Sequence, residues 1–340
     1  MKDRPLVSVI LPIYNTGAIL ENTFDSIINQ DYQNIELIMI DDGSNCETAA
    51  LADKLAQKDE RVTLIHQDNL GTCAARNYGI RLAKGDYITF CDHDDEYSND
   101  LILTEVQAAQ ACDYDIVVIG KKYIFDNKSN KCFGCDFECS DRNESQRFFL
   151  NLIANHTAST VWNVLYKKSV VKEIFFNEEL RKGQEDILFN LNIIKNINSI
   201  KSIEKCLYMH YVRNGMSTSA GLHRETLTAM GYTIEKIADV IQEISVEGRN
   251  DIVALQGSLL KTYVMYAVKL GISAEEFKKC VKELNVYRID MNAYQIRSIG
   301  GFFYYLVYKE KMDIMYYTIK IYSTIKRIQT GAFKWKKQCH

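Results

Sequence analysis

The sequence contains no long apolar run. No stretch approaches the eighteen or so uninterrupted apolar residues that a membrane-spanning helix needs. The first apolar segment, residues 6–11, is too short to be the apolar part of a secretion signal followed by a cleavage site. Ten cysteines in a chain without such a signal are typical of reduced thiols rather than of disulfide bonds. We therefore expect a cytoplasmic protein, either free or peripheral on the inner face of the plasma membrane.

A strong charge of one sign is also missing. The formal net charge is -3 and 25% of the residues are charged, which argues against a protein that grips nucleic acid along its whole surface. The chain has no Gly-x-x-x-x-Gly-Lys-Ser/Thr run, and no Gly-x-Gly-x-x-Gly follows the first apolar segment, which disfavours P-loop enzymes and the common dinucleotide-binding dehydrogenases. Cys132, Cys135 and Cys139 lack a second pair of ligands at zinc spacing, so no zinc site is expected.

Proline is scarce, and only Pro5 and Pro12 are present. From about residue 222 onward the sequence is rich in Tyr, Ile and Lys and almost free of turn clusters, which predicts a series of helices. We therefore divide the chain into a domain of residues 1–219 and a helical region of residues 220–340.

Short apolar runs alternate with helix-like segments in the first domain. This order predicts βαβ units, and hence an α/β fold with a mostly parallel, nucleotide-binding sheet flanked by helices. The predicted strands are residues 6–11, 35–40, 62–65, 87–91, 114–119 and 161–166, with a hairpin over 121–139. The predicted helices are residues 19–29, 48–57, 73–83, 99–111, 145–154 and 184–194.

Carboxylates follow several of these strands. Ligands of open α/β sheets bind outside the carboxyl ends of the strands, so these positions are candidates for a functional site. The densest cluster is Asp92-His93-Asp94-Asp95, which follows the strand at residues 87–91. Crowded carboxylates repel each other unless a divalent cation lies among them, and such a cation completes its shell with phosphate oxygens. The alternative is a plain acidic turn.

Two further segments are candidates on the same grounds. Asp41-Asp42-Gly43-Ser44 ends a buried strand, and its carboxylates could accept hydrogen bonds from a base or a ribose; the alternative is an N-cap for the next helix. Arg76 follows a stretch of small residues, and its planar guanidinium suits a diphosphate or a carboxylate; the alternative is a salt-bridged arginine on a surface helix.

Taken in order, these segments resemble the family 2 glycosyltransferases, which have the GT-A fold. The likeness covers residues 6–219 and is strongest up to Leu101. It is carried by Val7-Ser8-Val9-Ile10-Leu11-Pro12-Ile13-Tyr14-Asn15, Gln30-Asp31-Tyr32, Asp41-Asp42-Gly43-Ser44, Ala75-Arg76-Asn77-Tyr78-Gly79, Gly85-Asp86-Tyr87-Ile88 and the Asp92–Asp95 tetrapeptide.

The resemblance implies a nucleotide-sugar half at about residues 1–100 and an acceptor half at about residues 101–219. In the first half, it implies that a UDP-sugar lies against Pro12, Tyr14 and Asn15, with Asp41 or Asp42 on the uracil and Arg76 near the base or the diphosphate. Asp92 and Asp94 correspond to the family's Asp-x-Asp pair, which with Asp95 would hold Mn²⁺ or Mg²⁺. His93 occupies the variable position between them and is a further candidate for contact with the nucleotide sugar or the metal.

In the second half, the resemblance makes Asp186 the general base that deprotonates the acceptor hydroxyl, with Glu185 beside it. Trp162 lies where the family builds its acceptor site, so its ring could stack on a sugar; the alternative is a buried core tryptophan. By the same likeness, His210 or Arg213 would approach the diphosphate.

The carboxyl-terminal region differs in charge from the rest of the chain. Residues 301–340 contain seven Lys and one Arg against one Glu and one Asp, a net charge of +6. The interleaved aromatic and aliphatic residues resemble helices that lie on anionic membranes. The alternative is a helical subdomain that packs on the first domain and exposes a basic face.

These observations together predict an inverting hexosyl- or N-acetylhexosaminyltransferase. It would move a sugar from UDP to a hydroxyl of a lipid-linked glycan in the synthesis of a cell-surface polysaccharide such as a capsule. Two alternatives remain open from the sequence: a catalytically silent nucleotide-sugar binder or scaffold, and a sugar nucleotidyltransferase. No nucleic-acid partner is expected.

Overall fold

The computed structural model describes residues 4–125, 130–181, 183–213, 224–243, 249–284, 305–306, 309 and 311–321. The chain divides into two compact units, Met1–Ala220 and Gly221–His340. Each unit is described by itself.

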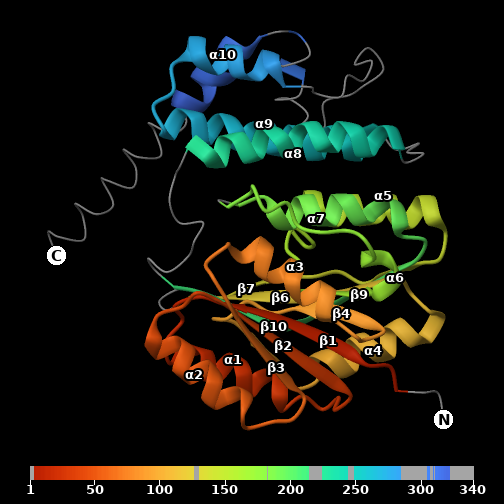
Figure 1. The fold of residues 1–340 in the computed structure, drawn as a ribbon. Helices are drawn as coiled ribbons and strands as arrows, with labels where there is room; N and C mark the ends of the chain where they lie inside the picture. Colours follow the sequence, from red (N-terminus) through yellow and green to blue (C-terminus); the bar gives the residue numbers. More distant parts are fainter. Residues whose placement is uncertain are drawn as a thin grey trace, which may run out of the picture. The chain divides into compact units, whose positions relative to one another are not determined.

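A ten-stranded sheet forms the centre of the first unit (Figure 1). Its strands lie in the order β3-β2-β1-β4-β9-β6-β10-β5, while β7 pairs with β6 and β8 pairs with β10. The bounds are β1 (Val7–Ile13), β2 (Ile35–Asp42), β3 (Val62–Gln67), β4 (Tyr87–Phe90), β5 (Glu96–Tyr97), β6 (Ile116–Phe125), β7 (Lys131–Phe133), β8 (Phe137–Cys139), β9 (Val164–Lys167) and β10 (Ile200–Val212).

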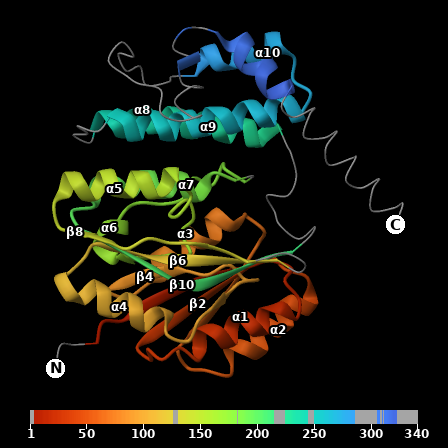
Figure 2. The ribbon, with the colours of Figure 1, turned by 180° about the vertical axis from the view of Figure 1, so that it is seen from behind.

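The helices of this unit cover both faces of the sheet. Figures 1 and 2 show α1, α2 and α4 on one face and α3, α5 and α7 on the other. The bounds are α1 (Ile19–Ile28), α2 (Cys46–Ala56), α3 (Thr72–Leu82), α4 (Leu101–Cys112), α5 (Arg142–Ala154), α6 (Lys168–Val171) and α7 (Glu185–Ile193), followed by a 3-10 turn at Ile194–Asn196. The predicted α/β architecture is confirmed.

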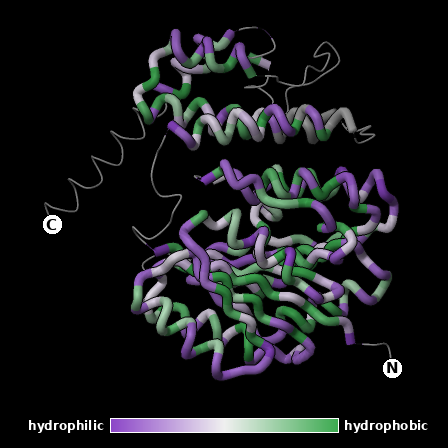
Figure 3. Tube along the Cα trace, viewed as in Figure 1, coloured by the Kyte–Doolittle hydropathy of each residue, from purple (hydrophilic) through white to green (hydrophobic). Residues whose placement is uncertain are grey.

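Covered faces explain the composition of the central strands. Every residue of β1 is buried, and β2 is buried except at Glu36, so both strands are nearly continuous apolar runs as expected for parallel strands between two helical layers. Figure 3 shows these hydrophobic residues gathered in the sheet. The apolar runs also predicted the positions of β1 to β4. The ends of each observed strand lie within two residues of the predicted ends.

The sheet is less parallel than the sequence predicts. Strands β1 to β4 are parallel, and β6 is parallel to β10. Strand β9 runs antiparallel to both β4 and β6 and so joins the two parallel groups. It begins at Val164 rather than at residue 161, because residues 161–163 form part of a loop. Strand β10 was not predicted, since its Lys and Glu residues interrupt the apolar pattern.

The second unit is helical in its described parts. Helices α8 (Arg224–Glu243) and α9 (Arg249–Lys269) lie side by side, and α10 (Ala274–Glu283) follows them (Figures 1 and 2). Residues 312–321 form one more helix, whose Tyr316 hydroxyl donates to the Ile272 carbonyl at 2.6 Å. No helix within the described ranges is long and apolar enough to cross a membrane. Residues 301–304, 307–308, 310 and 322–340 of the predicted basic segment lie outside the described residues.

Candidate functional site

Strands β1, β2 and β4 end at one edge of the sheet, and the candidate residues of the first half follow them there. The register pairs Ile13 of β1 with Asp41 of β2, so the segment after β1 lies beside the Asp41-Asp42-Gly43-Ser44 turn. Asn15 connects the two: its backbone N–H donates to the Ser44 hydroxyl at 3.0 Å, and its side-chain oxygen accepts from the Asn45 N–H at 2.7 Å. Pro12 is buried behind this connection, while Tyr14 is 42% exposed beside it.

Asp41 is buried and binds groups from β3 and from its own turn. One oxygen accepts from the Ser44 N–H at 3.1 Å, and the other lies 2.7 Å from Nδ1 of His66. The second ring nitrogen of His66 lies 3.2 Å from Asp53. The bond to Asp41 raises the pKa of His66, so the imidazole is more readily charged than usual. Asp41 therefore has an imidazole partner, and each of its oxygens keeps further acceptor capacity.

Asp42 has a different set of contacts. It accepts from the Gln67 side chain at 2.7 Å and from the backbone N–H groups of Leu70 and Gly71 at 2.8 and 2.9 Å. These bonds hold the connection that leads from β3 into α3. Gly71 stands there with a φ of +97°, a conformation that residues with a side chain rarely adopt. Asp42 therefore stabilises the conformation of this loop.

Arg76 joins the two halves of the site. Nη1 donates to Asp186 at 2.7 Å and Nη2 donates to Asp92 at 2.8 Å. The side chain is 3% exposed, so the alternative of a surface salt bridge does not apply. Its guanidinium also lies 5.2 Å from the centroid of the Phe176 ring. One buried cation therefore places a carboxylate from the end of β4 opposite a carboxylate from the start of α7.

Asp186 and Glu185 form the first turn of α7. Burial raises the pKa of Asp186, and the attraction of Arg76 opposes that rise. The backbone N–H of Val161 also lowers the pKa of Asp186 and so favours its ionised form. Burial raises the pKa of Glu185 to about 7, and the neighbouring Asp186 adds to the effect. Of the two acids, Asp186 has the direct cationic partner, which makes it the one more suited to act as an ionised base.

Asp92 and Asp94 are each partly exposed and each paired with one arginine. The Asp92 side chain is 30% exposed and the Asp94 side chain 23%. Arg213 donates to the Asp94 carboxylate at 3.2 Å and also to the Asp94 carbonyl. Each aspartate has a second carboxylate oxygen that no donor among the described residues occupies. The tetrapeptide therefore presents two open carboxylate oxygens at the edge of the sheet.

Asp95 differs from its neighbours because it is fully buried. It accepts from the Tyr208 hydroxyl at 2.8 Å, from His210 Nδ1 at 2.8 Å and from the Tyr211 N–H at 3.0 Å. Burial raises the pKa of Asp95 to about 6, against the bond from His210. With both oxygens bound inside the protein, Asp95 does not fit the predicted role of metal ligand. It anchors the tetrapeptide to β10 instead.

His93 is partly exposed, but one of its ring nitrogens is buried. Its carbonyl accepts from the Thr23 hydroxyl at 3.1 Å, and its buried Nδ1 has no hydrogen-bond partner within the described parts of the chain. Burial lowers the pKa of His93, which favours the neutral imidazole. Contact of His93 with a nucleotide sugar or a metal stays a prediction.

Trp162 is a packed residue rather than an open platform. It is 3% exposed, and its ring stacks on Tyr208 at 4.1 Å and on His210 at 5.4 Å between centroids. The Lys121 ammonium lies 4.8 Å from the indole centroid. These contacts favour the alternative of a core tryptophan over stacking on an acceptor sugar.

Two residues of the site, Tyr208 and His66, escaped the sequence analysis, yet each contacts an aspartate of the site. Tyr208 and His210 alternate along β10 and so face the same side of the sheet, a pattern that could have indicated a shared partner once the strand was recognised. His210 and Arg213 contact Asp95 and Asp94 here, and their approach to a diphosphate stays a prediction.

The donor set fits a hard divalent cation in its chemistry. Asp92 and Asp94 offer carboxylate oxygens, the ligands that Mn²⁺ and Mg²⁺ prefer, and a cation bound by two carboxylates completes its shell with phosphate and water. Within the described ranges, no group of three or more His, Cys, Asp or Glu side chains forms a metal cage. The residues therefore fit a cation that is held jointly with a substrate phosphate.

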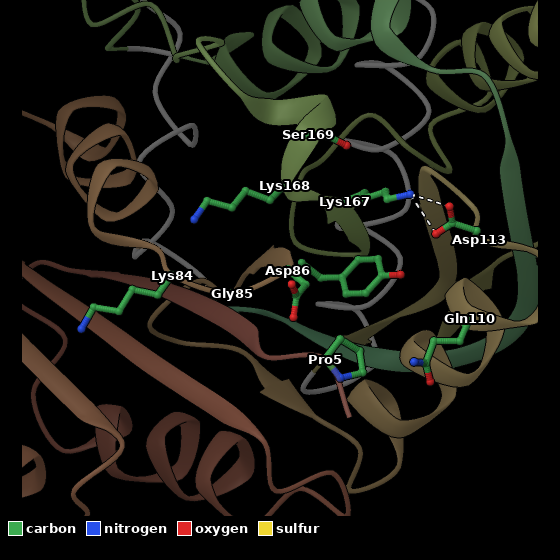
Figure 4. Close-up of a pocket in the computed structure, with 10 residues that line it drawn as sticks. Pro5, Lys84, Gly85, Asp86, Gln110, Asp113, Lys167, Lys168 and Ser169 are labelled. Atoms are coloured by element: carbon green, nitrogen blue, oxygen red, sulfur yellow. Dashed lines mark hydrogen bonds and ion pairs between the residues drawn. The ribbon is translucent and has the colours of Figure 1, made fainter. Parts of the chain in front are cut away.

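A separate pocket lies at the opposite edge of the sheet, where β4 begins and β9 ends (Figure 4). Its lining includes Asp86, Lys168 and the ion pair of Lys167 with Asp113 at 2.8 Å. None of the carboxylates that Arg76 binds takes part in it. This pocket is not part of the candidate site.

The sequence matches the family described as Glycosyl transferase family 2 over residues 8–175. Glycosyltransferase GlyG of Streptococcus pneumoniae is 34% identical over 220 residues, which are 62% of this chain and 72% of that protein. The uncharacterized glycosyltransferase EpsJ of Bacillus subtilis is 30% identical over 226 residues, which are 61% of this chain and 61% of that protein.

Solved structures share the fold. S. aureus TarS 1-349 superposes with a TM-score of 0.67 at 17% identity, covering 94% of this chain and 91% of that chain. Mannosyltransferase PcManGT from Pyrobaculum calidifontis, in complex with GDP-Man and Mn²⁺, has a TM-score of 0.53 at 15% identity, covering 96% and 85%. The family match, the related sequences and the shared fold lead to one conclusion: the chain belongs to glycosyltransferase family 2 and is a glycosyltransferase of the GT-A fold.

Proposed function

We propose that this enzyme transfers a sugar from a UDP-sugar to a hydroxyl of a glycan acceptor by a single, metal-assisted displacement with inversion. The observation that carries the proposal is the pair of bonds from Arg76 to Asp92 and Asp186. Arg76 thus binds both Asp92, proposed to hold the donor's metal, and Asp186, proposed to remove the proton. TarS, which shares the fold, has been crystallised with UDP-GlcNAc and with UDP, which supports UDP as the nucleotide.

The donor would lie along the edge formed by the ends of β1, β2 and β4. Asp41 is the better candidate for the uracil, because Asp42 already accepts three hydrogen bonds from the β3–α3 connection. Tyr14 is exposed enough to pack on the base. The other residues proposed to contact the nucleotide sugar are Pro12, Asn15, Arg76, His93, His210 and Arg213.

Asp92 and Asp94 would hold the divalent cation. When bound, Mn²⁺ or Mg²⁺ supplies positive charge where the departing UDP gains negative charge on its β-phosphate. The arginines that pair with these aspartates add positive charge to an edge that would accommodate a diphosphate.

Asp186 would act as the general base. As the acceptor oxygen attacks the anomeric carbon, its proton moves to the Asp186 carboxylate and the bond from the anomeric carbon to UDP breaks. Attack from the side opposite UDP inverts the anomeric centre. Arg76 and the Val161 backbone both act to lower the pKa of Asp186, which favours the ionised carboxylate that this step requires.

The acceptor is proposed to be a lipid-linked glycan of a cell-surface polysaccharide, reached at the inner face of the plasma membrane. A related protein is named putative colanic acid biosynthesis glycosyl transferase WcaA, from Escherichia coli, and is 27% identical. Residues 301–340 carry a net charge of +6, which suits an anionic lipid surface. The described helix over residues 312–321 exposes Ile314, Tyr317 and Ile321 at helical spacing.

Thermal unfolding with a panel of nucleotide sugars tests the donor. A ligand at one hundred times its Kd stabilises a protein by roughly 2.7 kcal/mol. We expect UDP and one UDP-sugar to raise the midpoint with Mn²⁺ and much less with excess EDTA. Stabilisation by GDP-sugars alone would contradict the proposed nucleotide, and full turnover in EDTA would contradict the metal.

Turnover of the selected UDP-sugar tests the base. Asp186→Asn is expected to lower transfer or donor hydrolysis about 100-fold or more while UDP still binds. Asp113→Asn is the matched control, because Asp113 pairs with Lys167 at the opposite edge of the sheet. UDP binding by the wild-type protein without turnover of any donor would indicate a silent binder instead.

A further inference from the structure

His66 lies beside the proposed donor site and has no role in the proposed reaction. It stands near the end of β3, and the register of the sheet pairs it with Asp41 of β2. Nδ1 of its ring lies 2.7 Å from a carboxylate oxygen of Asp41, and Nε2 lies 3.2 Å from a carboxylate oxygen of Asp53 on α2. The side chain is 45% exposed, so the ring can exchange protons with solvent. One imidazole therefore bridges a buried acid of the site and an exposed acid of a neighbouring helix.

Both partners of the His66 ring are hydrogen-bond acceptors. A neutral imidazole has one N–H and a lone pair on its other nitrogen, so it can donate to only one of two carboxylates, whereas a protonated ring donates to both. The observed arrangement thus matches the protonated form. The bond to Asp41 and, to a smaller extent, the bond to Asp53 raise the pKa of His66 above its ordinary value of 6.5, against the effect of burial. Among the described residues, these two acids are the titratable groups that face the ring.

The next pair of residues in the same two strands has no titratable donor. Asp42 is paired with Gln67 and accepts from its amide at 2.7 Å. Successive residues of a strand point to opposite faces of the sheet, so the Asp41–His66 and Asp42–Gln67 pairs lie on different sides. Of the two acids at the end of β2, Asp41 is therefore the one whose hydrogen bonding changes with pH.

The contacts of Asp41 restrict its orientation. Oδ1 accepts from the Ser44 N–H at 3.1 Å, while Oδ2 faces His66. The side chain is also buried. A carboxylate that is bound at both oxygens cannot turn freely, yet each oxygen can accept one more hydrogen bond. A nucleotide base that binds Asp41 must therefore bring a donor to a fixed point.

Uracil and cytosine differ in the group that they would present at such a point. The ring nitrogen N3 carries a hydrogen in uracil, whereas in cytosine it has a lone pair and the nearest donor is the amino group on the adjacent carbon. A carboxylate fixed towards N3 accepts from uracil and repels cytosine. A carboxylate that can turn would accept from the cytosine amino group instead, and the site would discriminate less between the two bases.

We propose that His66 is a positioning residue that sets base specificity: its protonated ring holds the Asp41 carboxylate in the orientation that accepts from uracil and repels cytosine. The inference rests on the proposed contact of Asp41 with uracil. A neutral ring keeps at most one of its two bonds, and its bond to Asp41 loses the contribution of the positive charge. The preference for uridine over cytidine nucleotides therefore declines as the pH rises through the pKa of His66.

The ratio of the dissociation constants of CDP and UDP measures this preference. Isothermal titration of the full chain with each nucleotide, in the presence of Mg²⁺, gives the ratio from pH 6 to pH 8.5. The two ligands share the same diphosphate, so titration of the phosphate and binding of the metal cancel in the ratio. A purely structural role of His66 would weaken both ligands alike and leave the ratio unchanged.

The wild-type protein should prefer UDP by about tenfold or more at pH 6, and less at pH 8.5. His66→Leu should lower the ratio by at least about threefold at pH 6 and remove its pH dependence, because Asp41 loses a donor. His66→Gln should restore part of the preference at every pH, since an amide donates without titrating.

Asp53→Asn tests the second proton of the ring. It leaves His66 and Asp41 in place but removes an acid that raises the pKa of His66, so the preference should decline at lower pH than in the wild type. Glu60→Gln is the matched control, because it removes an exposed acid from the connection that enters β3, at the opposite end of the strand from His66. Its profile should equal that of the wild type.

A wild-type ratio in His66→Leu overturns the inference, and so does a ratio that is independent of pH in both the wild type and Asp53→Asn. Asp41→Ala distinguishes this failure from a failure of the proposed function. If Asp41→Ala loses the preference while His66→Leu retains it, only the role of His66 is wrong. If Asp41→Ala also retains it, the proposed uracil contact is wrong. Should His66→Leu fail to fold, His66→Gln and Asp53→Asn provide the test.

Discussion

Removal of Arg76 should destabilise the first unit, and increasingly so as the pH rises. Arg76 is 3% exposed and binds Asp186 and Asp92 at 2.7 and 2.8 Å. In Arg76→Met both carboxylates lose their partner while Glu185 remains beside them. Breaking a buried ion pair costs roughly 3–5 kcal/mol. At about 2–4 °C per kcal/mol for a unit of this size, the unfolding midpoint should fall by about 6–20 °C near neutral pH.

The sign of the pH effect follows from the acids that remain. Burial already raises the pKa of Asp186, and raises that of Glu185 from 4.5 to about 7. An acid whose pKa is raised in the folded state binds its proton more tightly there than in the unfolded state. The folded protein therefore loses stability as the pH rises from the unfolded pKa to the folded pKa. Without Arg76 these pKa values rise further. The difference between wild type and Arg76→Met should therefore be smallest near pH 5 and grow towards pH 8.

Differential scanning fluorimetry from pH 5 to pH 8 would measure this difference. Arg81→Met is the matched control: Arg81 lies on the same helix, but it is exposed and stacks on Phe175 at 4.8 Å, so its loss should cost little at any pH. A difference for Arg76→Met that stays constant or shrinks with rising pH would refute the electrostatic reasoning. A loss equal to that of Arg81→Met would refute the structural role of the two bonds.

Three further changes have expected outcomes. Tyr208→Phe removes a hydroxyl that donates to buried Asp95, and should lower the free energy of unfolding by about 1–3 kcal/mol in urea titrations; a neutral result would mean that other donors suffice. Gly85→Ala would place a Cβ 2.6 Å from the Ser8 hydroxyl and 2.7 Å from the Ser8 backbone nitrogen. The unfolding midpoint of the purified variant should therefore be at least several degrees lower than that of the wild type. An unchanged midpoint would contradict the close approach. Asp94→Asn weakens the proposed cation site, so isothermal titration should show UDP binding that no longer responds to Mn²⁺; a retained response would remove Asp94 from the ligand set.

The positions of the strands in the first half could be predicted because apolar runs in the sequence coincide with buried strands in the structure. Strands β1, β2 and β4 are buried on both faces, so each is a nearly uninterrupted apolar run in the sequence. Strand β10 offers no such signal, since its residues alternate between buried, intermediate and exposed positions and include Lys201, Glu204 and Lys205. Its place in the sheet depends on β6, which lies about eighty residues earlier in the chain.

The identity of the charged residues could be predicted, but not their partners. The sequence singled out Asp92, Arg76 and Asp186 separately, and only the fold shows that one guanidinium binds both acids. The same limit explains Asp95, which is indistinguishable from Asp94 in sequence but accepts from three residues of β10. Pairings of this kind join residues far apart in the chain, so neither spacing nor composition carries a sign of them.

The dependence of the site on β10 sets the order in which this enzyme can become competent during synthesis. Asp95 and its partner His210 are separated by 115 residues, and the family match ends at residue 175, before Asp186 and β10 have been made. A nascent chain that ends at residue 175 contains the Asp92–Asp95 tetrapeptide but lacks the residues of β10 that donate hydrogen bonds to Asp95. Nucleotide-sugar binding to chains arrested at successive lengths should therefore be absent at residue 175 and appear only after β10 has paired with β6. The Asp95 contacts can therefore be completed only after the last strand of the first unit has been made.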